Sequence, residues 1–106
     1  MPLEIEGPLY LTLDQGGHAS RALVFDERGT LLAKGLREVR VHHPQPDWVE
    51  QDPEELISSL RDAIGDALGN LGHKAPLFAA VGLATQRSSI VCWDRVTGRA
   101  LSPVIS

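Results

Sequence analysis

Residues 9–35 read LYLTLDQGGHASRALVFDERGTLLAKG, and this stretch decides the fold. Residues 9–13 are almost wholly apolar and predict a buried strand, and residues 20–26 predict a second strand. The DERG sequence at residues 26–29 has glycine at the last position of a β-turn, which indicates a tight connection. Residues 30–41 predict a third strand, so we expect three strands joined by two short turns to form a meander.

The sequence HHPQPDWVEQDPEE follows, and its three prolines interrupt the strand pattern. We expect residues 44–51 to form an ordered loop, because Trp48 and Val49 are too apolar to be left in water. These two side chains are expected to pack the loop on the sheet.

A helix is predicted after this loop. The Asp-Pro pair at residues 52–53 supplies a favoured N-cap and a proline suited to the first helical position, and Glu55 is expected to complete a capping box. Gly72 predicts the end of the helix. Gly65 and Gly69 lie inside it, and we expect them to allow close approach to a sheet. The apolar side chains that recur at helical spacing are Leu56, Ile57, Leu60, Ala63, Ile64, Ala67, Leu68 and Leu71.

The remaining sequence predicts two more strands. Phe78–Ala84 is a nearly continuous apolar run, typical of a central strand that is covered on both faces. Residues 90–94 predict another strand, followed by a hairpin turn that closes on Gly98, and Cys92 is expected to pack in the core. The predicted order β-β-β-α-β-β indicates an α/β chain.

Size and charge limit the classes of function. A chain of 106 residues with 42% apolar and 23% charged residues is typical of one small globular domain. Its net charge of −4 and the lack of a Lys/Arg cluster argue against nucleic acid as a partner. No apolar run is long enough to cross a membrane, and the solitary Cys92 fits a reducing compartment. We therefore expect a cytoplasmic protein with neither membrane nor nucleic acid as its partner.

The turn between the first two strands has residues suited to a metal–nucleotide site. Gly16 and Gly17 would expose backbone N–H groups able to hold an anion such as phosphate. Asp14 would repel phosphate unless a divalent cation lay between them, and Mg²⁺ suits that position. Arg21 would add a forked donor for phosphate. The alternative is an ordinary hairpin whose glycines have positive φ and whose aspartate bonds the turn backbone.

Several separate motifs, in order, extend the argument beyond this turn. The stretches LTLDQGGHASRALVFDERGTLLAKG, HHPQPDWVEQDPEEL and VGLATQRSSIVCWDRVTGRAL resemble the start of the FGGY family of carbohydrate kinases, the glycerol kinase branch above all. The resemblance spans residues 9–104. It implies a truncated ribonuclease H-like half-domain of the actin-like ATPase superfamily. The predicted order of strands and helix is similar to that fold.

The resemblance also implies roles for residues of the first turn. Asp14 would help to hold Mg²⁺ through water. The backbone and side chains that would bind the phosphates of ATP are Gly16, Gly17, His18, Ala19 and Arg21. Glycerol kinases have two threonines and a serine at the positions of Gly17, His18 and Ala19, so three hydroxyl donors are lost here. A protonated His18 would add positive charge, and an exposed turn histidine without function is the alternative.

A second set of residues is implied in substrate binding. Gln86, Arg87 and Ser88 match the family's polyol-recognition segment, in which the arginine is followed by glutamate. Serine is a weaker and shorter acceptor of hydroxyl hydrogen bonds than a carboxylate. Glycerol and a larger sugar or polyol therefore both remain open as substrates.

Family members are several times longer and have two such domains, with ATP and sugar between them. We expect residues 1–106 to be a single partial domain whose partner is the remainder of the chain, including the second domain. The family's general-base aspartate lies further along, so no catalytic residue is expected here and the piece alone should be inactive. An open sheet edge would also allow a homodimer. The alternatives are a different actin-like ATPase and a sugar-sensing protein that binds without transfer.

Overall fold

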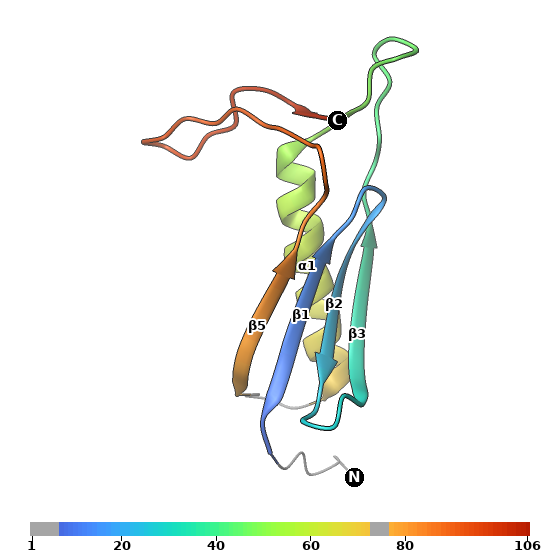
Figure 1. The fold of residues 1–106 in the computed structure, drawn as a ribbon, viewed down its shortest axis with the longest axis vertical. Helices are drawn as coiled ribbons and strands as arrows, with labels where there is room; N and C mark the ends of the chain where they lie inside the picture. The colour runs from blue at the N-terminus through green and yellow to red at the C-terminus, as the bar shows by residue number, and fades with distance from the viewer. Residues whose placement is uncertain (1–6, 73–76) are drawn as a thin grey trace.

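The computed structural model describes residues 7–72 and 77–106 (Figure 1). A four-stranded sheet in the order β3-β2-β1-β5 forms its main layer. Strands β1, β2 and β3 pair antiparallel, which confirms the predicted meander, and β5 pairs parallel to β1. The bounds are β1 Leu9–Gln15, β2 Ala19–Phe25, β3 Leu31–Glu38 and β5 Phe78–Ala84.

One helix, α1 (Pro53–Leu71), covers the sheet behind β2 and β3 (Figure 1). Alternate strand residues face this helix, as the period of two in a strand requires. Their side chains form the core with those of the helix. The buried members of this core are Leu9, Leu11, Ala22, Val24, Ala33, Ala63 and Ala67. The opposite face of the sheet is therefore left for other contacts.

The predicted ends of the helix are confirmed. The Asp52 side chain accepts a hydrogen bond from the Glu54 backbone N–H at 3.0 Å, and Pro53 occupies the first turn. Gly72 ends the helix in the left-handed region, with φ of 71°. The prediction that Glu55 completes a capping box is wrong, because its carboxylate accepts hydrogen bonds from the backbone N–H and guanidinium of Arg40, at 2.6 and 3.0 Å.

This contact predicts a pH dependence. The side-chain hydrogen bond from Arg40 lowers the pKa of Glu55 below its ordinary value of 4.5. The folded pKa is below the unfolded one, so the contact stabilises the protein above about pH 4.5 and is lost as the pH falls through the folded value. We expect Glu55→Gln to lower the melting temperature near neutral pH and to match the unmodified protein in strong acid. Thermal unfolding across this range measures it, and a deficit that is constant with pH would contradict it.

Helix and sheet meet closely at small residues. A Cβ added at Gly35 of β3 would overlap the carbonyl oxygen of Ala63 and lie 2.9 Å from the Ala67 nitrogen. At Gly65 and Gly69 an added Cβ would meet nothing within 4 Å, so the prediction that these two glycines allow the close approach is wrong. The contact depends instead on Gly35, because it lies on the covered face of the sheet.

Strand β5 lies at the edge of the sheet, with β1 as its partner. The interpretation of this apolar run as a central, covered strand is wrong for the described residues. Val81 and Leu83 are 58% and 61% exposed, because α1 packs mainly on β3 and β2. Because β5 pairs only with β1 among the described strands, its other side leaves an open edge of unpaired backbone groups.

The C-terminal part departs most from the prediction. Residues 90–94 form no strand; they make single bridges, Ile90 with Ile105 and Trp93 with Ala100. The turn that closes on Gly98 is confirmed by a hydrogen bond from its N–H to the Asp94 carbonyl at 2.8 Å. Cys92 is exposed rather than packed in the core. The apolar side chains of this segment have no covering element in the described part of the chain, so no extended ladder forms.

A second, two-stranded sheet joins the loop before the helix to the end of the chain. It consists of β4 (Glu50–Gln51) and β6 (Val104–Ile105), paired antiparallel. Trp48 is 51% exposed, so the prediction that it packs on the main sheet is wrong. The loop instead lies against β6, where the Ser106 N–H donates to the Val49 carbonyl at 3.2 Å.

Within residues 7–72 and 77–106, no helix combines the length and apolar character needed to cross a membrane.

Candidate functional site

The carboxyl ends of β1 and β5 lie at the same end of the sheet, where both arrowheads point in Figure 1. The register pairs Asp14 with Ala84, so the first turn (residues 16–19) and the segment after β5 begin side by side. In open sheets with parallel strands, ligands bind outside the carboxyl ends of those strands. This end of the sheet therefore brings together the two separate sets of site residues that the sequence predicted.

The backbone of the first turn is held by its carbonyl groups. Gly16 closes the turn by donating its N–H to the Ala19 carbonyl at 2.9 Å. Three consecutive carbonyls then accept hydrogen bonds from three other segments. The Gly16 carbonyl accepts from the Gln86 side chain at 3.2 Å, that of Gly17 from the Gln51 side chain at 2.8 Å, and that of His18 from the Val39 N–H at 2.9 Å.

The N–H groups of the turn point the other way. In a planar trans peptide the C=O and the following N–H lie on opposite sides. Holding the Gly16 and Gly17 carbonyls toward the protein therefore directs the N–H groups of Gly17 and His18 away from it. Neither N–H donates to an acceptor among the described residues. Two free, fixed donors at a turn are the arrangement that binds an anion.

The conformation of the turn does not explain its two glycines. Positive φ occurs at other glycines of the described chain and not at Gly16 or Gly17. A Cβ added at Gly17 would meet nothing within 4 Å. The ordinary-hairpin interpretation, in which these glycines are required for positive φ, is therefore wrong. Gly17 borders open space, so its side of the turn is accessible.

Asp14 and Arg21 stand opposite each other across β1 and β2. Directly paired residues project from the same face of a sheet, here the face opposite α1 because their neighbours Leu11 and Ala22 are buried in the core. Both side chains are exposed, and neither makes an ion pair within the part of the chain that the structure describes. A carboxylate and a guanidinium on the same face of the sheet therefore flank the first turn.

The described residues hold no group of three or more His, Cys, Asp or Glu side chains that could bind a metal alone. A single exposed carboxylate still fits Mg²⁺, which keeps several waters and is commonly bound by one or two carboxylates together with substrate phosphates. Asp14 has that environment.

The segment after β5 is held at one residue and open at the next two. The Gln86 side chain donates to the first turn and accepts from the Ser89 hydroxyl at 2.9 Å. Arg87 is exposed, with no ion pair within the described residues. Ser88 has φ of 57°, a left-handed conformation that is uncommon for a residue with a side chain. Such strain is often found at binding sites.

Two further glutamines take part, and sequence reasoning missed both. Gln15 is at the end of β1 and Gln51 in β4, with exposures of 9% and 3%. Their side-chain oxygens accept from the Gln86 Nε2 at 3.0 and 2.8 Å. We call Gln15, Gln51 and Gln86 the glutamine network. The available signal was a polar residue at each strand end, which is too common to single out these positions.

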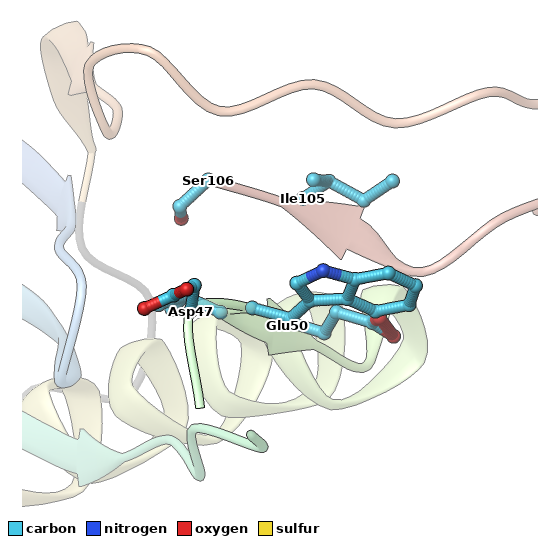
Figure 2. Close-up of a pocket in the computed structure, with 6 residues that line it drawn as sticks. Asp47, Glu50, Ile105 and Ser106 are labelled. Carbon is cyan, nitrogen blue, oxygen red and sulfur yellow. The ribbon is translucent and has the colours of Figure 1, made fainter. Parts of the chain in front are cut away.

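Among the described residues, two cavities of about 290 Å³ each lie beside β4 and β6, and Gln51 of the glutamine network lines one of them. One is lined by the loop before the helix and the chain end, with Asp47 and Glu50 facing Ile105 and Ser106 (Figure 2). None of the predicted phosphate-binding or substrate-binding residues lines either cavity.

Comparison with known proteins identifies the family of this chain. The profile of the FGGY family of carbohydrate kinases, N-terminal domain, matches residues 9–106. The chain is 45% identical over 89 residues to a glycerol kinase of Beutenbergia cavernae, covering 84% of this chain and 18% of that protein. It is 45% identical over 95 residues to a glycerol kinase of Bordetella pertussis, covering 90% and 19%. The chain thus spans about a fifth of the length of these relatives.

Solved structures share the fold. A xyloylose kinase from Brucella ovis matches with a TM-score of 0.85 and 31% identity, over 92% of this chain and 20% of that one. Plasmodium falciparum glycerol kinase, solved with ADP, matches in fold with a TM-score of 0.83 and 23% identity, over 96% and 21%. The expected α/β fold of the family's N-terminal domain is confirmed. The chain belongs to the FGGY family of carbohydrate kinases, and it aligns within their N-terminal domain.

Proposed function

We propose that this chain forms the N-terminal part of an ATP-dependent kinase that transfers the γ-phosphate to a hydroxyl of a sugar or polyol. The observation that carries the proposal is the pair of free N–H groups at Gly17 and His18, fixed beside the Gln86–Arg87 segment. One end of the sheet then holds a site for the phosphates of ATP and a site for the substrate in adjacent loops. Membership of the family supports the same assignment.

Each residue has a role that its chemistry allows. The N–H groups of Gly17 and His18 bind phosphate oxygens, and Arg21 adds a forked cationic donor. Mg²⁺ held near Asp14 would neutralise phosphate charge. Arg87 donates to the substrate's hydroxyl groups, while Ser88 offers a weak acceptor where a carboxylate is expected.

The remaining machinery belongs to other residues. A general base must accept the proton of the attacking hydroxyl, and we assign it to an aspartate outside residues 1–106. The exposed edge of β5 and its uncovered apolar residues fit contact with the remainder of the same chain. We therefore propose that residues 1–106 alone are a partial domain without kinase activity. A cytoplasmic location and a homodimer through the open edge stay predictions.

A sugar and polyol panel tests the proposal. We expect the full polypeptide that carries these residues to phosphorylate at least one of glycerol, xylulose or gluconate with MgATP, and residues 1–106 alone to phosphorylate none. Product formation is measured by ADP release together with detection of the phosphorylated sugar. Arg87→Met should raise the KM for the sugar about tenfold or more, because a charge-assisted hydrogen bond is lost, and leave the KM for ATP near its original value.

The two alternatives give different results in the same assay. A sugar sensor would bind sugar without transferring phosphate. A different actin-like ATPase would release ADP at a rate that no sugar changes. Either result would contradict the kinase assignment.

A further inference from the structure

The glutamine network joins three distant segments at the first turn. Gln86 lies 71 positions from Gln15 and 35 from Gln51, yet its Nε2 contacts the side-chain oxygens of both and the carbonyl of Gly16. Gln15 donates to the same Gly16 carbonyl at 3.0 Å. Every buried side-chain nitrogen and oxygen in the described residues has a partner. A partly buried polar network in which each buried polar atom has a partner restricts the movement of its members.

Three hydrogen bonds of the network are donated to the backbone of the first turn. Side-chain N–H groups of the network point at the carbonyls of the turn, namely those of Gly16 and Gly17. Since each peptide is planar, fixing a carbonyl also fixes the N–H on its other side. The network thus acts on the anion-binding side of the turn without touching a ligand there.

We infer that Gln51 and Gln86 are positioning residues that orient the phosphate-binding N–H groups of the first turn, and that Gln86 also couples this turn to the substrate segment. The inference rests on the proposed function, because phosphate is the ligand that these donors would bind. Gln51 orients the His18 N–H through the Gly17 carbonyl, and Gln86 together with Gln15 orients the Gly17 N–H through the Gly16 carbonyl. Gln86 precedes Arg87 directly, so its anchoring also fixes where the arginine begins.

Substitution of Gln51 and substitution of Gln86 should therefore have different effects on nucleotide and sugar binding. Gln51→Met keeps the side-chain length and removes the donor to the Gly17 carbonyl. We expect it to raise the Kd for MgADP and the KM for MgATP about tenfold, the size of one lost hydrogen bond, and to leave the KM for sugar near its original value. Gln86→Met removes the Nε2 donor to the first turn and the Oε1 acceptor of the Ser89 hydroxyl, and it should raise the KM for MgATP and for sugar together.

Matched variants separate orientation from charge and from folding. Gln45→Met makes the same change at an exposed glutamine of the preceding loop and should alter neither constant. Gln51→Glu adds a negative charge beside the turn; a loss seen with Gln51→Glu and not with Gln51→Met would reflect charge alone and overturn the inference. Amide hydrogen exchange at Gly16 and Val39, whose N–H groups close the turn, should quicken in Gln51→Met while exchange in α1 is unchanged.

The experiment uses the full polypeptide, with MgADP as the probe in calorimetry. Absence of MgADP binding by the unmodified protein would remove the proposed function and the inference with it. Binding that Gln51→Met leaves unchanged would remove the inference and leave the proposed function standing. A loss of MgADP affinity in Gln51→Met without a change in sugar KM, together with loss of both in Gln86→Met, supports the inference.

Discussion

Gly35→Ala is expected to lower the free energy of unfolding by about 3 kcal/mol, the upper end of the cost of overpacking a close contact. The added methyl group would overlap the carbonyl oxygen of Ala63 and press on the Ala67 nitrogen. Both atoms belong to the helix backbone, so no side chain can rotate away, and α1 must shift from β3. Urea denaturation followed by circular dichroism measures the change.

The same substitution inside the helix provides the control. At Gly65 and Gly69 a Cβ has open space, and alanine is a better helix former than glycine by about 1 kcal/mol. Gly65→Ala and Gly69→Ala should therefore raise the stability slightly. If Gly35→Ala unfolds at the same urea concentration as these two variants, the close contact between β3 and α1 is not as described.

Asp14→Asn is expected to reduce kcat/KM for MgATP on the order of 100-fold, the size typical of losing a group that acts on a metal through its outer shell. Asparagine keeps the shape of the side chain and removes the charge. The residue is exposed, so the fold should be unaffected. Initial rates over a range of Mg²⁺ concentrations should show a higher Mg²⁺ requirement in the variant.

Asp62→Asn is the matched control, since it removes an exposed carboxylate from α1, away from the first turn. It should leave both the rate and the Mg²⁺ requirement as they are. Turnover by Asp14→Asn with an unchanged Mg²⁺ dependence would contradict the metal role proposed for Asp14.

Local patterns were enough to predict the meander and the helix. The strand patterns of residues 9–13 and 20–26, the DERG turn, and the Asp-Pro and Gly72 ends of α1 each report on contacts close in sequence. Residues 90–94 have the composition of a strand but make only single bridges. Strand propensity describes a surface that suits burial, and it does not supply the neighbour that would cover it.

Predictions about tertiary contacts depended on information the sequence does not contain locally. Nothing in the order of residues distinguishes Gly35, which faces the helix backbone, from Gly65, which faces open space. Asp14, Gly17 and Arg87 were predicted as site residues because motifs mark them, and they stay predictions. Gln51 and Gln15 were missed because hydrogen bonds to Gln86 across 35 and 71 positions leave no periodic pattern.

The contacts of Gln86 also set an order of events during synthesis. Domains begin to fold as the N-terminal residues emerge. The meander and the helix use residues up to Gly72, so they can assemble while the next strand is still being made. Only after β5 has joined the sheet does Gln86 reach the Gly16 carbonyl. The nascent chain therefore acquires its scaffold first and the contacts that fix the first turn last.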